Sequence, residues 1–292
     1  MKNEHLGKSI DSNGARLVKT DVFDITITNE EKGSVLEFVL RTLKKKDKKY
    51  FIVTPNPEII VYASKHPAFK KILNSAEIAL CDGMQLFRAA AFVGKPLQER
   101  ITGVEFMEVI CKYISEKPIT VGFLGGRDGV AKITAERLVQ KYPGLKVGFV
   151  GEEWPSNPPL NPLQGGETIT NKNIPSCGGG AEGGGRVTTS GGISQPQSIS
   201  CDILFVAFGF PKQEEWIFNN FSKVNVTVMM GVGGAFDYIS GRVPRAPLWV
   251  QKLGFEWLFR LVRQPWRWRR QLSLLEFICL VMKEKMKKKN SS

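Results

Sequence analysis

The stretch Ile119–Val150, ITVGFLGGRDGVAKITAERLVQKYPGLKVGFV, decides the fold class. It begins with an apolar run, Ile119–Leu124, turns through glycines and continues into a helical pattern over Gly129–Lys141. A second apolar run, Lys146–Val150, follows directly. Apolar strands that alternate with helices are typical of a parallel sheet buried on both faces. The stretch therefore predicts a βαβ unit.

The same alternation extends along most of the chain. Further strands are predicted at Val22–Thr28, Tyr50–Thr54, Ile78–Cys81, Asp202–Phe208 and Val226–Gly231. Helices are predicted at Glu30–Lys45, Glu58–Lys65, Gly83–Phe92, Val104–Ser115 and Lys212–Phe221. We predict an α/β fold with a Rossmann-like open, mainly parallel sheet and helices on both faces. Ligands of such sheets bind at the C-terminal ends of the strands, so the loops found there are the candidate site.

Composition divides the 292 residues into three parts and one insertion. We predict a polar N-terminal tail (1–19), an α/β catalytic domain (20–246) and a helical basic appendage (247–292). The stretch Pro155–Ser200 holds 10 Gly and 6 Pro and no aromatic residue. Such a stretch cannot bury enough apolar surface to offset its ordering entropy, which predicts a disordered insertion. A glycine-rich phosphate loop is the alternative, but such loops are short and lead straight from a strand into a helix.

The last 52 residues, 241–292, concentrate positive charge and tryptophan. They carry 13 of the 41 Lys and Arg against three Glu, and four of the six Trp. Two helices are predicted there, Pro247–Val262 and Pro265–Lys285. Interleaved basic and aromatic residues suit an anionic membrane surface or a nucleic acid. On one continuous helix, the spacing of Arg260, Arg263, Arg267 and Arg270 would align them on one face.

Several classes of protein are disfavoured by what the sequence lacks. No apolar run reaches the roughly 18 residues that a membrane-spanning helix needs. The start of the chain has no apolar stretch of signal-peptide type, which predicts that the protein stays in the cytoplasm. The five Cys are widely spaced and there are only two His, so a disulfide framework and a zinc site are not expected. We expect no metal ion and no cofactor.

Two strand-end loops carry the candidate catalytic residues. After the second strand, the prolines of TPNPE fix a turn that holds Thr54 and Asn56; a purely rigid turn is the alternative. After the third strand comes Asp82, which either caps the next helix or acts as a catalytic carboxylate. Partial burial beside apolar neighbours would raise its basicity and favour the second role.

The remaining loops carry candidate substrate-binding residues. Arg100 precedes a helix start and forms either an anion site or a surface ion pair with Glu99 or Glu105. Gly125 and Gly126 allow backbone NH groups to approach a diphosphate, whereas their spacing disfavours a nicotinamide dinucleotide site and hence an oxidoreductase. Polar side chains at the start of a later helix and a turn with three glycines complete the set: Lys212, Gln213 and Gly233.

These loops together resemble the WecG/TagA/CpsF family of bacterial glycosyltransferases, its TagA-type members in particular. The resemblance spans nearly the whole chain outside the N-terminal tail and the insertion. Each motif is modest alone, but their order along the chain is specific. The motifs are TPNPE (54–58), CDGM (81–84), ERITGVEFM (99–107), FLGG (123–126), AFGFPKQE (207–214), GVGGAFDYISGRVPRAP (231–247) and WLFRLVRQPWRWRR (257–270).

The resemblance implies an inverting, metal-independent transfer of N-acetylmannosamine from a UDP-sugar to undecaprenyl-diphosphate-linked N-acetylglucosamine, as in wall teichoic acid synthesis. It implies that Asp82 is the general base, with Thr54, Asn56 and Gln213 beside it. Arginines of the appendage that match the family, Arg260, Arg267 and Arg270, would stabilise the departing UDP. The absence of a DxD triplet agrees with a reaction in which cationic side chains replace a metal.

Some alternatives remain open at this point. Relatives use N-acetylmannosamine, its uronic acid or glucose, so the donor is not fixed, and neither is a homo-oligomeric state. The appendage predicts a peripheral protein on the inner face of the bacterial cell membrane. A nucleic-acid-binding protein is the alternative from another class, but it leaves the polar strand-end loops without a purpose; we therefore expect no nucleic acid partner.

Overall fold

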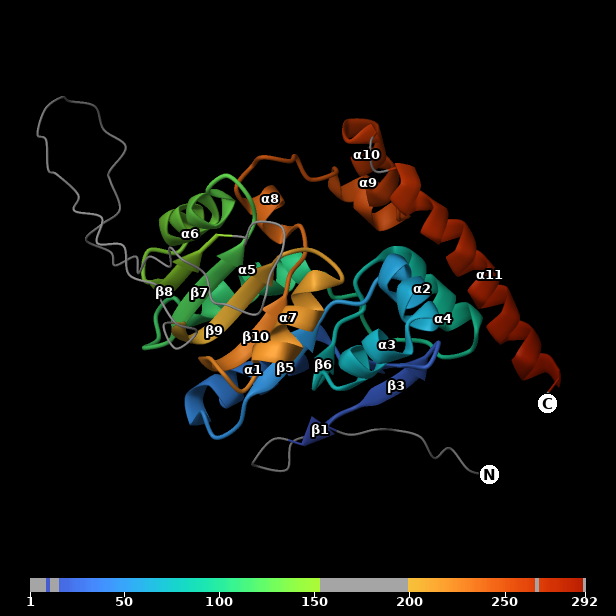
Figure 1. Ribbon diagram of the computed structural model, residues 1–292, viewed down its shortest axis with the longest axis horizontal. Coiled ribbons are helices and arrows are strands. Elements are labelled where there is room, and N and C mark those ends of the chain that lie inside the picture. Colours follow the sequence, from blue (N-terminus) through green and yellow to red (C-terminus); the bar gives the residue numbers. More distant parts are fainter. Residues whose placement is uncertain (1–8, 11–15, 153–198, 266–267, 291–292) are drawn as a thin grey trace, which may run out of the picture.

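A computed structural model of the chain describes residues 9–10, 16–152, 199–265 and 268–290. Its centre is a six-stranded sheet in the order β6-β5-β10-β9-β7-β8, and every neighbouring pair is parallel (Figure 1). The strands are β5 (Tyr50–Val53), β6 (Ile78–Ala79), β7 (Thr120–Gly125), β8 (Lys146–Gly151), β9 (Ser200–Ala207) and β10 (Asn225–Gly231). The predicted open parallel sheet is confirmed.

Helices cover both faces of this sheet, as predicted. Successive side chains of a strand point to opposite faces, so Ile203 and Phe205 of β9 join one core while Leu204 and Val206 join the other. The first core is closed by α1 (Lys32–Lys45), α5 (Gly103–Ile114), α6 (Val130–Lys141) and α8 (Ala235–Ile239). The second is closed by α2 (Pro57–Lys65), α3 (Pro67–Asn74), α4 (Met84–Phe92) and α7 (Lys212–Asn220).

The predicted strand Val22–Thr28 is wrong, because the chain reverses in its middle. β3 (Lys19–Val22) and β4 (Ile25–Thr28) form an antiparallel hairpin in a sheet of their own. Phe23 and Asp24 make the turn with φ angles of 56° and 59°. Positive φ at both central residues lets a two-residue turn match the right-handed twist of its strands. A further short pair, β1 (Ser9–Ile10) and β2 (Arg16–Leu17), lies before the hairpin.

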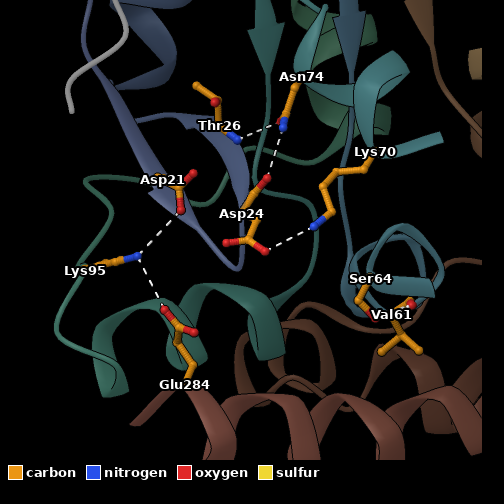
Figure 2. A network of polar contacts seen from close by, with 9 residues as sticks. All are labelled: Asp21, Asp24, Thr26, Val61, Ser64, Lys70, Asn74, Lys95 and Glu284. Carbon is orange, nitrogen blue, oxygen red and sulfur yellow. Dashed lines mark hydrogen bonds and ion pairs between the residues drawn. The ribbon is translucent and has the colours of Figure 1, made fainter. Parts of the chain in front are cut away.

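Polar contacts attach the hairpin to its surroundings (Figure 2). Asn74 at the end of α3 bonds to β4 and to the turn: its Oδ1 accepts from the backbone nitrogen of Thr26, and its Nδ2 donates to the backbone oxygen of Asp24, each at 3.0 Å. Lys95 pairs with β3 and also with Glu284, at 3.7 Å, in the C-terminal helix. The hairpin therefore joins the α/β core to the appendage.

The appendage is helical, as predicted, but its first helix is broken. The predicted helix Pro247–Val262 consists of α9 (Leu248–Leu253) and α10 (Glu256–Arg263), separated at Gly254, whose φ is 85°. The last helix is α11 (Trp268–Asn290), which runs along one side of the molecule beside α2 (Figure 1). Because α10 ends at Arg263 and α11 begins at Trp268, the four arginines do not share one continuous helix, and the condition for their alignment on one face is not met.

Helix α11 is part of the core as well as part of the surface. Its Phe277 and Val281 are buried in the second core, and the ring of Phe277 lies edge-on to that of Phe23, with centroids 5.5 Å apart. The opposite side exposes large apolar side chains: Trp268, Leu272, Leu275, Ile278, Met282 and Met286. In the part of the chain that the structure covers, no helix combines the length and apolar character needed to cross a membrane.

The predicted insertion Pro155–Ser200 falls outside the described residues except at its end. Ile199 is buried in the second core, and β9 begins at Ser200 rather than at the predicted Asp202. These last two residues belong to the ordered fold, so the predicted boundary is wrong there. The reason is that Ile199 packs in the second core. A single apolar residue in a polar stretch gives no periodic pattern from which this packing could be predicted.

Candidate functional site

A cleft of about 610 Å³ lies over the C-terminal ends of the strands. The loops after β5, β6, β9 and β10 form its floor, and residues of α9, α10 and α11 form its outer wall. The chain leaves β5 toward α2 on one face of the sheet and leaves β10 toward α8 on the other. Adjacent strands whose connections diverge in this way leave a crevice between them, which is where open α/β sheets bind ligands.

Asp82 occupies the floor of the cleft. Its backbone nitrogen donates to the carbonyl of Pro55 at 2.9 Å, which joins the loops after β5 and β6. Its Oδ2 accepts from the backbone nitrogen of Gly103, the first residue of α5, at 3.3 Å. It does not cap the helix that follows it, because the N-cap of α4 is Gly83. The carboxyl group therefore has one backbone partner and otherwise faces the cleft.

The pKa of Asp82 is raised to about 6, chiefly because burial disfavours the charged form. The negative charge of Glu256 raises the pKa further, whereas the Gly103 hydrogen bond and the charges of Arg100 and Arg245 lower it. A carboxylate with a pKa just below neutral is ionised at pH 7 and basic enough to take a proton from a hydroxyl group. This is the electrostatic environment that a general base requires.

Thr54 and Asn56 lie beside Asp82 in the cleft, each with a structural bond. The Thr54 hydroxyl donates to the backbone oxygen of Gly231 at 3.2 Å, which joins the loops after β5 and β10. The Oδ1 of Asn56 accepts from the backbone nitrogen of Ile59 at 3.0 Å and caps α2. Both side chains form hydrogen bonds that stiffen the turn, as the rigid-turn alternative expects. Both also line the cleft, so the structure leaves a role in the site open to them.

Two predicted cations border the same cleft. Arg100 lines it close enough to Asp82 to lower that residue's pKa. Its alternative, an ion pair with Glu99 or Glu105, is not formed: Glu99 pairs with Lys32 at 3.5 Å, and Glu105 pairs with Arg245 at 2.9 Å. Lys212 is the first residue of α7, where it adds its charge to the positive end of the helix dipole. Both cations are placed where an anionic ligand would bind.

The two glycines after β7 have different surroundings. Gly126 lines the cleft, and its backbone nitrogen donates to the carbonyl of Ala207 at 3.3 Å. Gly125 does not line the cleft; a Cβ there would lie 2.9 Å from the backbone carbon of Ala207. Its predicted part in substrate binding is therefore not supported by its position. The residue is required to be small because two strands approach closely.

Gln213 and Gly233 are joined by a hydrogen bond. Gln213 is buried, and its Oε1 accepts from the backbone nitrogen of Gly233 at 2.9 Å. Its Nε2 donates to Oε1 of Glu214 at 2.8 Å. Gly233 has a φ of 54° and open space around its missing side chain. The glycine turn after β10 is thus held by a side chain from the first turn of α7.

Arg260 of α10 reaches this glycine turn. A Cβ on Gly234 would lie 2.8 Å from its Nη2, so the guanidinium packs directly on the turn. The same side chain lies over the ring of Tyr238, 5.0 Å from its centroid, and 3.6 Å from Oδ2 of Asp237. Arg260 therefore lines the cleft, and its part in binding the leaving group stays a prediction. Arg267 lies outside the described residues, and so does the side chain of Arg270 in α11.

Sequence reasoning missed two charged residues of the site, Arg245 just before the appendage and Glu256 within it. Arg245 bonds to Glu105 of α5 at 2.9 Å and lies 3.8 Å from Glu256 of α10, and both Arg245 and Glu256 line the cleft. The sequence held one signal: Glu256 is one of only three acidic residues among the last 52. No three His, Cys, Asp or Glu side chains gather as metal ligands would within the described ranges.

The sequence is similar to known glycosyltransferases. A family described as "Glycosyl transferase WecG/TagA/CpsF family" matches residues 20–155 and 192–291, so most of the predicted insertion is left unmatched. A protein of Bacillus spizizenii is 29% identical over 260 residues, 89% of each chain. One of Staphylococcus aureus is 30% identical over 245 residues, 82% of this chain and 83% of the relative.

Both relatives carry the name N-acetylglucosaminyldiphosphoundecaprenol N-acetyl-beta-D-mannosaminyltransferase. A relative from Bacillus subtilis with the same name is 29% identical over 238 residues, 82% of this chain and 81% of its own. The match covers every strand of the parallel sheet and the loops that form the cleft. The chain therefore belongs to the WecG/TagA/CpsF family and is a glycosyltransferase.

Proposed function

We propose that this chain transfers N-acetylmannosamine from a UDP-sugar to N-acetylglucosaminyl-diphosphoundecaprenol, with inversion and without a metal ion. The sugar and the acceptor are those in the names of its relatives. One observation carries the mechanism: the Asp82 carboxyl group, made more basic by burial, shares a single cleft with Arg100, Lys212 and Arg260. A base and a set of cations are the two components that an inverting transfer with an anionic leaving group requires.

In this mechanism Asp82 removes the proton from the acceptor hydroxyl. The oxygen then attacks the anomeric carbon from the face opposite UDP, the bond from that carbon to the UDP oxygen breaks, and UDP leaves with the electron pair. The proton remains on Asp82 until solvent removes it. Thr54 and Asn56 border the reacting groups, and their backbone-anchored side chains keep this part of the cleft rigid. A rigid floor favours the aligned geometry that in-line attack needs.

The negative charge that develops on UDP requires compensation from the protein. We assign this role to Arg260, with Arg100 and Lys212 as further ligands of the diphosphate; Gly126 borders the same cleft, but its backbone NH already donates to Ala207. Arg260 packs against the glycine turn after β10 while its ion partner Asp237 remains 3.6 Å away. A guanidinium can bind a diphosphate with two parallel hydrogen bonds, which a single carboxylate at that distance does not match. Arg267 and Arg270 stay in the proposal as further ligands.

We also propose that the protein is peripheral on the inner face of the bacterial cell membrane. Support comes from α11, whose exposed apolar side chains lie opposite its buried ones and whose end is rich in lysine. Each basic residue near an anionic leaflet contributes roughly 1 kcal/mol of binding free energy. Because Phe277 and Val281 are buried, only the outer stripe of the apolar block 272–282 can enter the lipid. The acceptor's polyprenyl chain would lie in the same leaflet.

The experiment is UDP release from UDP-N-acetylmannosamine with a lipid-diphosphate-linked N-acetylglucosamine acceptor in the presence of EDTA. We expect acceptor-dependent turnover that survives EDTA and falls by at least about 100-fold in Asp82→Asn, the contribution typical of a general base. Asp128→Asn is the matched control: Asp128 is exposed, lies outside the cleft lining and has a φ of 55°, which asparagine tolerates. Turnover that requires a divalent ion, or an active Asp82→Asn, would contradict the mechanism.

The donor is tested with the same assay. UDP-N-acetylmannosaminuronic acid and UDP-glucose replace UDP-N-acetylmannosamine at equal concentration, and kcat/KM is compared. Turnover with one of these donors alone would keep the base and the cations but change the sugar. The absence of turnover with every donor would contradict the proposed reaction.

A further inference from the structure

Glu214 is the most deeply buried carboxyl group near the cleft, and the mechanism above does not use it. It is completely inaccessible to solvent, and its Oε2 has no hydrogen-bond partner. It does not line the cleft itself. A buried carboxyl group with an unpaired oxygen lowers stability, so its presence calls for a functional explanation. Its single side-chain partner is therefore informative.

That partner is the amide of Gln213, which has to be oriented correctly. The backbone nitrogen of Gly233 is a donor, so the Gln213 amide must present its oxygen to it, and it does so at 2.9 Å. The Nε2 must then find an acceptor on the other side. Glu214 Oε1 supplies that acceptor at 2.8 Å. With an apolar side chain at position 214, the buried Nε2 would lose its partner and the amide would lose its preferred orientation.

The effect of this orientation extends along the turn after β10. Gly231 passes so close to Gln213 that an added Cβ would lie 3.0 Å from Nε2. The oxygen of Gly231 accepts from the Thr54 hydroxyl, and Gly234 carries the guanidinium of Arg260 against it. One amide therefore holds the turn that contacts both a residue beside the base and the cation assigned to UDP.

We propose that Glu214 is a positioning residue for the nucleotide side of the cleft. Its carboxyl oxygen fixes the Gln213 amide, and through it the 231–234 turn on which Arg260 rests. The identity of the ligand, UDP, rests on the proposed function. The hydrogen bonds that join Glu214, Gln213 and Gly233 are independent of it. Burial also raises the pKa of Glu214 to about 7; both protonation states keep an oxygen that can accept from Nε2, so the positioning does not depend on ionisation.

The test compares Glu214→Gln, which keeps an acceptor oxygen, with Glu214→Leu, which has a similar volume and no acceptor. Glu215→Gln is the matched control, because Glu215 lies on the same helix turn and outside the cleft lining. UDP affinity is measured by calorimetry well below the melting temperature, and amide exchange is followed in the peptide that contains the 231–234 turn. We expect Glu214→Leu to bind UDP roughly tenfold more weakly and to lose protection in the turn. Glu214→Gln should stay within about twofold of the wild type in both measurements.

A double-mutant cycle separates positioning from general destabilisation. If Glu214 acts through Gln213, then Glu214→Leu has little further effect on UDP affinity once Gln213 is replaced by Leu. An undiminished effect in that background, or a Glu214→Gln variant as impaired as Glu214→Leu, would overturn the proposal. If Glu214→Leu does not fold, Gly231→Ala displaces the same amide from the other side and should expose the turn to exchange. A wild type that fails to bind UDP would contradict the proposed function, while the exchange data would still decide the role of Glu214.

Discussion

The raised pKa of Asp82 predicts that one substitution abolishes turnover and stabilises the protein. With a pKa of about 6, this carboxyl group is about 90% ionised at pH 7 and about 10% ionised at pH 5. If Asp82 is the base, kcat/KM falls about tenfold from pH 7 to pH 5, and its logarithm approaches a slope of one below the pKa. An aspartate at its ordinary pKa of 3.8 would stay almost fully ionised over this range, and the profile would be flat.

The same pKa shift has a consequence for stability with a defined sign. Burial favours the protonated carboxyl group, so the stability contributed by Asp82 is fully present below pH 3.8 and is lost as the pH rises through about 6. A shift of about two units corresponds to up to about 3 kcal/mol at pH 8. Asp82→Asn cannot ionise, and its amide oxygen can still accept from Gly103. We therefore expect this variant to be more stable than the wild type at pH 8 and nearly equal to it at pH 4.

The measurement is urea unfolding of the wild type, Asp82→Asn and Asp128→Asn at pH 4, 6 and 8, together with the pH profile of kcat/KM for the wild type. Using the difference between variants isolates Asp82 from other groups that titrate in this range, such as Glu214. A stability gain that is the same at pH 4 and pH 8 would show that charge is not its cause. A flat kinetic profile between pH 5 and 7 would refute the assignment of the base.

Three further predictions concern the turn, the core and the surface of the appendage. Gly234→Ala places a methyl group 2.8 Å from Nη2 of Arg260 and should weaken UDP binding about tenfold by calorimetry, whereas Gly33→Ala, with open space around it, should not. Phe277→Ala should lower the free energy of unfolding by about 3 kcal/mol or more, because it empties a buried site against Phe23. Ile278→Ser changes the exposed neighbour of Phe277 and should leave the free energy of unfolding within about 0.5 kcal/mol of the wild type. It should also reduce co-sedimentation with anionic vesicles. Equal vesicle binding by this variant and the wild type would argue against the outer stripe as the anchor.

Periodicity predicted the parallel sheet because its strands are apolar throughout and its helices are long enough to show a repeat. It failed where the determining feature is local or short. The turn at Phe23 and Asp24 contains no glycine or asparagine, so the hairpin reads as one strand. α3 was missed because eight residues give little periodicity. The break at Gly254 was missed because an isolated glycine in a helical pattern is often tolerated.

The candidate site was predictable in the part that topology determines. Parallel strands end at one edge, so the loops that hold Thr54, Asp82 and Gln213 had to meet there. The contribution of the appendage was not predictable in the same way. Glu256 reaches the cleft because α10 lies over the strand ends, where it meets Arg245, and no sequence period records that packing.

The two faces of α11 connect the proposed membrane contact to the site. α10 carries Glu256 and Arg260 into the cleft and is separated from α11 by only four residues, 264–267. α11 is held on the α/β core by Phe277 and Val281, so it limits where α10 can lie. A force on the outer stripe of α11, such as insertion into a leaflet, therefore acts on the position of Arg260 as well. For this reason the appendage cannot be treated as a detachable anchor: its removal would open the second core and take a proposed UDP ligand from the cleft at the same time.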